Sequence, residues 1–211
     1  MPLARFERLE PERRQRLLAA AAQEFAAKGY EHASLGWIAD EAGFSKPALY
    51  YYFDDKADLY ATVIRESWQR LAPPTPVDLQ NLDAEGFWPA LEAYHLTTFD
   101  RTRQEPWLAA VWKLAYHPPP EGAGAGAVAE VFEAGHAFLR ALLRRGQELG
   151  VVRSDFPEEF LIAVLTGADH AADHWLVDHW ESLGLDEVQR LSRQVFETLQ
   201  LILSPAGRRE V

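Results

Sequence analysis

The sequence contains no cysteine. This absence excludes disulfides, thiol nucleophiles, iron–sulfur clusters and zinc sites built from cysteine. The sequence also lacks an uncharged apolar run of about 18 residues, so no transmembrane helix is expected. Residues 1–16 carry arginine and glutamate where a signal peptide would be apolar, so we expect no such signal either. We therefore expect a cytoplasmic protein that does not enter a membrane.

Positive charge is scarce as well. Lysine and arginine number 21 against 32 aspartate and glutamate residues, which gives a net charge of −11. This negative charge argues against electrostatic binding of nucleic acid by the protein surface as a whole. It leaves room for a local DNA-binding face, because salt screens distant charges within about 8 Å. A hydrophobic fraction of 48% is ordinary for a globular chain, and 211 residues suit one medium domain or a small domain joined to a larger one.

Apolar side chains recur at helical spacing along almost the whole chain, and no segment alternates as a strand would, so we expect an all-α fold without a sheet. Caps and glycines bound the first helices. The expected helices are 11–29, 35–42, 46–52, 56–71 and about 85–102, 105–116, 128–149, 157–182 and 186–203. Three prolines in 73–76 mark a domain joint, and a Pro/Gly-rich loop is expected over 118–126. The tail 206–211 is expected to be disordered.

Residues 34–53 read SLGWIADEAGFSKPALYYYF, and this is the most informative segment. One helix ends at Gly43, three residues turn, and a second short helix begins after Ser45, which is the plan of a helix-turn-helix. Leu49 is spaced to pack inward. Lys46, Ala48, Tyr50 and Tyr52 are then expected to point outward, where lysine and tyrosine suit a DNA surface.

The segment from Glu12 to Tyr60 resembles the DNA-binding domain of the tetracycline-repressor (TetR) family of bacterial transcription regulators. The residues that carry the resemblance are Phe25, Gly29, Tyr30, Ser34, Ile38, Ala39, Ala42, Gly43, Ser45, Lys46, Leu49, Tyr50, Tyr52, Phe53, Lys56 and Leu59. The later helices match the family only in number, length and order.

The resemblance implies a three-helix DNA-binding head over residues 1–55 and a helical ligand-binding and dimerisation domain over 56–205. It implies a homodimer whose last two long helices form a four-helix bundle with those of the partner. By position, Lys46, Pro47, Ala48 and Tyr50 would meet base edges or the adjacent backbone. Ser34, Ser45, Tyr52 and Lys56 would hold phosphates.

Two positions depart from the family pattern, and the N-terminus is open to two interpretations. Gly36 and Trp37 stand where members usually carry polar or basic side chains. We expect Trp37 to pack against the first helix, with a position on the DNA backbone as the alternative. Arg5 and Arg8 either form a flexible arm on the DNA or belong to an ordinary solvated and disordered start.

Six of the seven tryptophans lie beyond residue 60, together with further phenylalanine and tyrosine residues. Each one taken singly is expected in the core. Together with nearby acids they also suit a cavity for a flat apolar ligand or a lipophilic cation. The candidate ligand-binding residues are Trp68, Trp88, Trp107, Trp112, Tyr116, Trp175 and His179. His179 falls on the apolar face of its helix and is expected either in the core or as a polar group in the pocket.

A second hypothesis is a helical metal-dependent enzyme. His170 and His174 stand four residues apart, a spacing that metal ligands can use, and Asp178 extends the row. They fall opposite the apolar face, so a solvated or dimer-interface position is favoured over a metal. Motifs of hydrolases, zinc proteases and nucleotide-binding folds are missing. We therefore expect no enzyme activity and no cofactor.

The leading expectation is a ligand-responsive transcriptional repressor. Its homodimer would bind a pseudo-palindromic double-stranded DNA operator and would be released by an apolar or aromatic small-molecule effector. A DNA-binding structural protein without an effector is a third alternative.

Overall fold

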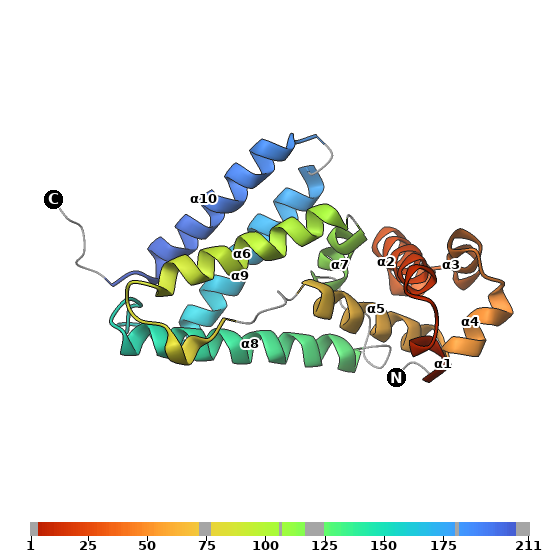
Figure 1. Ribbon diagram of the computed structural model, residues 1–211, viewed down its shortest axis with the longest axis horizontal. Coiled ribbons are helices and arrows are strands. Elements are labelled where there is room, and N and C mark those ends of the chain that lie inside the picture. The colour runs from red at the N-terminus through yellow and green to blue at the C-terminus, as the bar shows by residue number, and fades with distance from the viewer. Residues whose placement is uncertain (1–3, 72–76, 106, 117–124, 180–181, 206–211) are drawn as a thin grey trace. The chain divides into compact units, whose positions relative to one another are not determined.

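The computed structural model describes residues 4–71, 77–105, 107–116, 125–179 and 182–205, without the side chains of a few residues inside helices (Figure 1). These ranges contain helices and no strand, so the all-α prediction is confirmed. The expected loop over 118–126 lies mostly outside the described residues, and the tail 206–211 lies wholly outside them.

Ten α-helices and one short 3-10 helix make up the described chain. They are α1 (Ala4–Glu7), α2 (Pro11–His32), α3 (Leu35–Ala42), α4 (Lys46–Tyr52), α5 (Lys56–Leu71), η1 (Leu79–Asn81), α6 (Phe87–Gln104), α7 (Trp107–Tyr116), α8 (Ala125–Glu148), α9 (Glu158–His179) and α10 (Leu185–Leu203). The predicted bounds of α3, α4 and α5 are the observed ones.

Local capping explains the sharp bounds of these helices. Ser34 accepts a hydrogen bond from the backbone N–H of Trp37 at 3.2 Å, which caps α3. Gly43 ends α3 at φ 73°, a left-handed conformation that glycine adopts without strain. The Asp55 carboxylate accepts from the N–H of Asp58 at 2.8 Å and caps α5.

The backbone of α2 is interrupted at the glycine where the helix was expected to close. Gly29 has φ 71° and ψ 167°, which is not helical. A further helical turn follows the break and runs to His32, so α2 consists of two helical segments on either side of Gly29.

The chain divides into two compact units, and the division does not fall at residue 55. Unit 1 comprises residues 1–71 and 101–132, and unit 2 comprises 72–100 and 133–211. Helix α5 and helix α7 therefore pack with the head. The boundary at residue 55 separates the DNA-binding part from the ligand-binding part by resemblance to the family. As a functional boundary it stays a prediction.

Glu105 shows why α7 belongs to unit 1. Its carboxylate accepts hydrogen bonds from Gln15 of α2 at 2.9 Å and from Arg70 of α5 at 3.0 Å. The indole N–H of Trp107 donates to the same carboxylate at 3.1 Å. Buried Leu108 belongs to the apolar core of unit 1. Charged and apolar contacts thus bind three helices into one unit.

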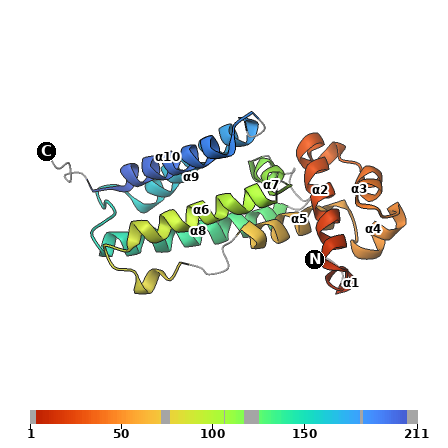
Figure 2. The same cartoon turned by 45° about the horizontal axis from the view of Figure 1, so that its top comes forward.

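Helix α1 was not expected. Phe6 is fully buried, with ring centroids 5.0 Å from Phe53 and 6.5 Å from Tyr52. Its burial holds α1 beside α4, as two views show (Figures 1 and 2). Both interpretations of this segment, a flexible arm and a disordered start, are therefore wrong for residues 4–7.

Unit 2 is built around a second apolar core, in which Phe87 and Leu143 are fully buried. Arg145 of α8 donates to the carbonyl of Leu82 at 2.6 Å and so fastens the segment before α6 to α8. His95 of α6 reaches Ser192 of α10 at 3.0 Å. Among the described helices, none has both the length and the apolar character that crossing a bilayer requires.

Candidate nucleic-acid interface

Helix α4 turns Leu49 inward and Lys46 and Tyr50 outward, as the sequence predicted. Leu49 is 2% exposed and belongs to the core of unit 1. Tyr50 is 52% exposed, and Lys46 and Pro47 are also exposed. Because one buried leucine fixes the helix, the side chains around it are presented at the surface of the head.

Two residues of the predicted outward set lie differently. Ala48 and Tyr52 are half-buried and pack against the core of unit 1. The Tyr52 ring lies between Phe6 at 6.5 Å and Phe44 at 6.0 Å, so the prediction that this side chain points outward is wrong. The sequence pattern missed this because Phe6 and Phe44 lie outside α4. A contact of either residue with DNA stays a prediction.

The two serines have different surroundings. Ser34 is used as the cap of α3, and its backbone N–H donates to the buried Glu24 carboxylate at 2.9 Å. Ser45 takes the cap position of α4 but makes no capping hydrogen bond with its side chain. Its exposed hydroxyl therefore remains available to an acceptor such as a phosphate.

Lys56 is engaged within the protein. Its ammonium donates to the carbonyls of Glu31 at 2.9 Å and Ala33 at 3.1 Å, and it lies 5.0 Å from the centre of the Tyr30 ring. These carbonyls stand at the negative end of α2, which a cation stabilises. The structure therefore gives Lys56 a part in closing α2, whereas its predicted phosphate contact stays a prediction.

Two exposed aromatic residues of the head were missed or misplaced by the sequence. Tyr51 is 52% exposed, as exposed as Tyr50, although it was not among the predicted contacts. Trp37 is 42% exposed, so the expectation that it packs against α2 is wrong. A run of three tyrosines was the available signal for Tyr51, but helical spacing alone does not decide which of three neighbours turns inward.

The described members of the predicted ligand-binding set are divided between the two units. Trp68 is 36% exposed on α5 and Trp107 is buried, both in unit 1. Trp88, in unit 2, packs against Phe196 with ring centroids 6.4 Å apart. The side chains of Trp112 and Tyr116 lie outside the described residues.

Trp175 and His179, the last two of that set, lie on α9 in unit 2. Trp175 is 47% exposed, and its ring stacks on His179 at 4.2 Å. The His179 ring nitrogen Nδ1 lies 2.8 Å from the carbonyl of Trp175, and the side chain is exposed. The expectation of a core position for His179 is therefore wrong in this chain, because its helical face is not covered there.

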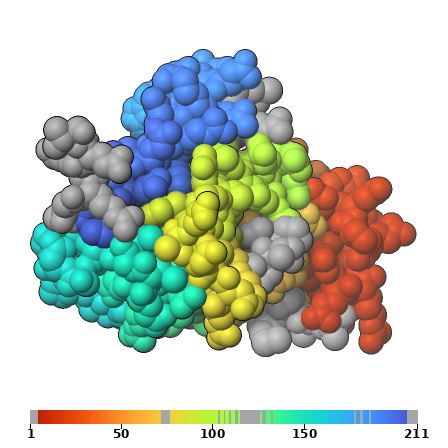
Figure 3. Space-filling model, turned by 60° about the vertical axis from the view of Figure 1, so that its left-hand side comes forward, coloured from red at the N-terminus to blue at the C-terminus, as the bar shows by residue number. Residues whose placement is uncertain are grey.

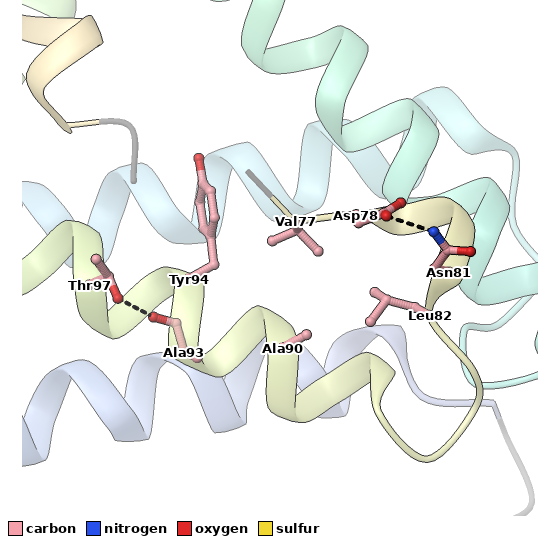
Figure 4. Close-up of a pocket in the computed structure, with 8 residues that line it drawn as sticks. All are labelled: Val77, Asp78, Asn81, Leu82, Ala90, Ala93, Tyr94 and Thr97. Carbon is pink, nitrogen blue, oxygen red and sulfur yellow. Dashed lines mark hydrogen bonds between the residues drawn. The ribbon is translucent and has the colours of Figure 1, made fainter. Parts of the chain in front are cut away.

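Unit 2 has a hollow of about 350 Å³ between the segment around η1 and helix α6 (Figure 4). Its lining is mainly apolar, with a tyrosine, a threonine and two polar groups at one end. The lining residues are Val77, Asp78, Asn81, Leu82, Ala90, Ala93, Tyr94 and Thr97. The Tyr94 ring stacks on Phe138 at 5.4 Å, and burial raises the pKa of its hydroxyl. None of the predicted ligand-binding residues lines this hollow, which lacks tryptophan.

The histidine row on α9 contains a close contact between an imidazole and a carboxylate. His174 Nδ1 lies 3.2 Å from Asp178, four residues along the same helix, and both side chains are about half exposed. Across the described part of the chain, no group of three or more histidine and carboxylate side chains is arranged to hold a metal ion.

Comparisons with known proteins agree with the geometry of the head. Residues 17–63 match the family model described as bacterial regulatory proteins, tetR family. The HTH-type transcriptional repressor SCO4008 of Streptomyces coelicolor is 32% identical over 162 residues, which cover 77% of each chain. The HTH-type transcriptional activator FasR of Mycolicibacterium smegmatis is 38% identical over 117 residues, 49% of this chain and 53% of that protein. This match thus spans about half the length of FasR.

The likeness extends to the fold of the whole chain. The structure of the fatty acid degradation regulator FadR from Bacillus halodurans matches with a TM-score of 0.73 at 20% identity. The match covers 95% of this chain and 98% of that one. Because the family model matches the head and SCO4008 matches more than three quarters of the sequence, this chain belongs to the TetR family of bacterial transcriptional regulators.

Proposed function

We propose that this chain is a ligand-responsive repressor that binds a pseudo-palindromic operator as a homodimer through α4. The observation that carries the proposal is the exposure of Lys46 and Tyr50 on a short helix that buried Leu49 anchors to the head. Two such heads would enter successive major grooves about 34–36 Å apart. We expect this work to take place in the cytoplasm, where the bacterial DNA lies.

Repression is preferred to activation because SCO4008, which matches most of this chain, is described as a repressor. FasR, described as an activator, matches about half of it. A reporter gene placed behind the operator distinguishes the two. Higher expression when the regulator gene is deleted supports repression, and lower expression contradicts it.

Dimerisation is supported by apolar side chains that unit 2 leaves uncovered on its last two helices. Phe160 and Trp175 of α9 are 50% and 47% exposed, and Leu201 of α10 is 75% exposed. The space-filling view shows the surface of α10 (blue) lying open on one face (Figure 3). A second copy of the same helices would remove this apolar area from water, as obligate homodimers do.

The hollow beside Tyr94 is the proposed effector site. Its size and mainly apolar lining suit a small apolar or aromatic compound, and Asp78 and Asn81 offer polar contacts at its end (Figure 4). The effector must bind the DNA-free conformation more tightly than the DNA-bound one, since only differential affinity shifts the equilibrium. The ligand roles predicted for Trp68, Trp88, Trp107, Trp112, Tyr116, Trp175 and His179 stay predictions.

We propose no catalytic activity and no cofactor. The metal-dependent alternative relied on His170 and His174, and the comparisons give it no support. Metal analysis of the purified protein tests the alternative directly. A stoichiometric metal that is lost from a His170→Ala, His174→Ala variant would favour it.

The DNA-binding proposal is tested with three single variants of the full chain. Duplexes are first selected from random double-stranded DNA with the unaltered protein. Lys46→Ala and Tyr50→Ala should weaken binding to the selected duplex more than binding to random DNA. The difference in binding free energy should be about 1–3 kcal/mol if a base contact is lost. Both should stay folded, because both side chains are exposed.

Leu49→Ala is the matched contrast. It should lower the free energy of unfolding by about 2–5 kcal/mol, because the leucine is buried. Circular dichroism reports folding and a salt titration reports binding. If the Lys46 and Tyr50 variants remain folded and bind the selected duplex like the unaltered protein, α4 is not the reading helix.

A further inference from the structure

Two arginines of the head lie on aromatic rings at opposite ends of α4. The guanidinium of Arg5 is 4.3 Å from the centre of the Tyr51 ring, near the C-terminal end of the helix. The guanidinium of Arg13 is 4.8 Å from the centre of the Phe44 ring, in the turn that precedes α4. Both arginines are exposed. A positive group therefore stands at each end of the predicted reading helix.

The position of each arginine is fixed by a buried neighbour. Phe6, the residue after Arg5, is fully buried against Phe53 and so seats α1 beside α4. Arg13 lies on α2, which is held by fully buried Leu17 and Leu18. The two guanidinium groups are thus presented from anchored helices, which lowers the entropy lost when either one binds a ligand.

Their electrostatic surroundings differ from those of most arginines in this acidic chain. Arg65, Arg144 and Arg153 are each paired with a carboxylate at 3.0 Å or less. Among the described residues, no carboxylate forms an ion pair with Arg5 or Arg13. An aromatic ring contacts one face of a guanidinium and leaves its N–H groups free to donate.

We propose that Arg5 and Arg13 bind DNA phosphates on either side of α4, an inference that rests on the proposed function. A planar guanidinium with free N–H donors matches two phosphate oxygens. The two arginines contact rings at the two ends of the helix that carries exposed Lys46 and Tyr50, and their charge is complementary to that of the duplex. Tyr51 is then a positioning residue, because its exposed ring holds the guanidinium of Arg5.

The experiment measures the salt dependence of binding to the selected duplex and to random duplex DNA. Arg5→Gln and Arg13→Gln should each lower the affinity for both duplexes by a similar factor, at least about tenfold. The reason is that a phosphate contact is lost in each subunit. The slope of log K against log salt should fall by about two per homodimer for each variant. Arg5→Lys should keep the parent slope while losing affinity.

Arg144→Gln is the control for net charge. Arg144 is an exposed arginine on α8 that pairs with Glu158, outside the head. This variant should leave both affinity and slope unchanged. Tyr51→Leu should lower affinity without the full change in slope, since the charge of Arg5 remains but is no longer held in place.

The outcomes separate this inference from the proposed function. If the unaltered protein does not prefer any selected duplex to random DNA, the proposed function fails. If it does, and folded Arg5→Gln and Arg13→Gln variants keep its affinity and slope, the inference about phosphates is wrong. A loss confined to the selected duplex would also overturn it, because the arginines would then read bases.

Discussion

Lys56 shows how one side chain can serve the fold where its position suggested a ligand contact. Its ammonium bridges the carbonyls of Glu31 and Ala33, twenty-five and twenty-three positions away in the chain. Helical periodicity carries no information on such a contact, because it joins the start of one helix to the end of another. The lysine links α5 to the end of α2 whether or not DNA is present.

Lys56→Ala should therefore destabilise the head. Removal of the ammonium leaves two helix-end carbonyls without their charged donor, and we expect the free energy of unfolding to fall by about 1–2 kcal/mol. Urea denaturation followed by circular dichroism measures the change. Lys46→Ala, which removes an exposed lysine without such partners, should stay within about 0.5 kcal/mol of the parent. Equal stability of the two variants would contradict this role for Lys56.

At the scale of elements, Gly146 lets α8 pack closely against Val152 and Phe87 of the same chain. A Cβ atom at this position would lie 2.3 Å from Val152 Cγ2 and 2.8 Å from the Phe87 ring. Both neighbours are buried, so neither can move without disturbing the core of unit 2. The glycine is therefore required by packing, even though it lowers the intrinsic stability of the helix.

Gly146→Ala should consequently destabilise the protein. Overpacking costs about 1–3 kcal/mol, which exceeds the gain of up to about 1 kcal/mol that alanine gives in a helix. Gly126→Ala is the control on the same helix, since nothing lies within 4 Å of the added atom. The melting temperature of Gly146→Ala should lie below that of the parent, and that of Gly126→Ala should equal or exceed it. The reverse order would show that the core yields easily.

A second prediction at this scale concerns the contact between α6 and α10. His95 lies against Ser192, and burial lowers the pKa of its imidazole below 6.5, an effect that Asp169, Ser192 and Glu92 partly oppose. The unfolded chain then binds more protons than the folded one in the range just below pH 6.5. Stability due to His95 is therefore present above this range and is lost as the pH falls through it.

The comparison of the parent with His95→Gln isolates this effect. Burial raises the pKa of the nearby Asp169 carboxyl, which acts in the opposite direction at acid pH, so the parent alone is not diagnostic. Between about pH 7.5 and about pH 5.5, the free energy of unfolding should fall more steeply for the parent than for His95→Gln. Parallel pH profiles of the two proteins would show that His95 does not titrate as described.

The whole molecule is expected to be a homodimer through α9 and α10. Light scattering of the full chain should give twice 23.9 kDa at micromolar concentration. Phe160→Glu combined with Leu201→Glu should give a folded monomer, because charges would replace exposed apolar side chains at the interface. Tyr50→Ala, on the head, should remain a dimer. A parent that is monomeric would contradict this part of the proposal.

The sequence alone determined the helical fold and the place of α4, the proposed reading helix. Caps and glycines act within a few residues of the helix they bound, so the bounds of α3, α4 and α5 follow from local chemistry. The spacing of Leu49 against Lys46 and Tyr50 gave the inward and outward sides of α4 for the same reason. The resemblance to the TetR family was also seen in this segment, whereas the match to SCO4008 over 77% of the chain shows the membership.

Only the tertiary structure decided which side chains are engaged in contacts within the protein and which side chains lie close to one another. Tyr52 is covered because Phe6 and Phe44 approach it from other segments, and Lys56 is held by the end of α2. The predicted tryptophans divide between two units, while Tyr94 lines a hollow that no periodicity marks. Each of these facts depends on contacts between residues distant in the chain, which neither propensity nor spacing encodes.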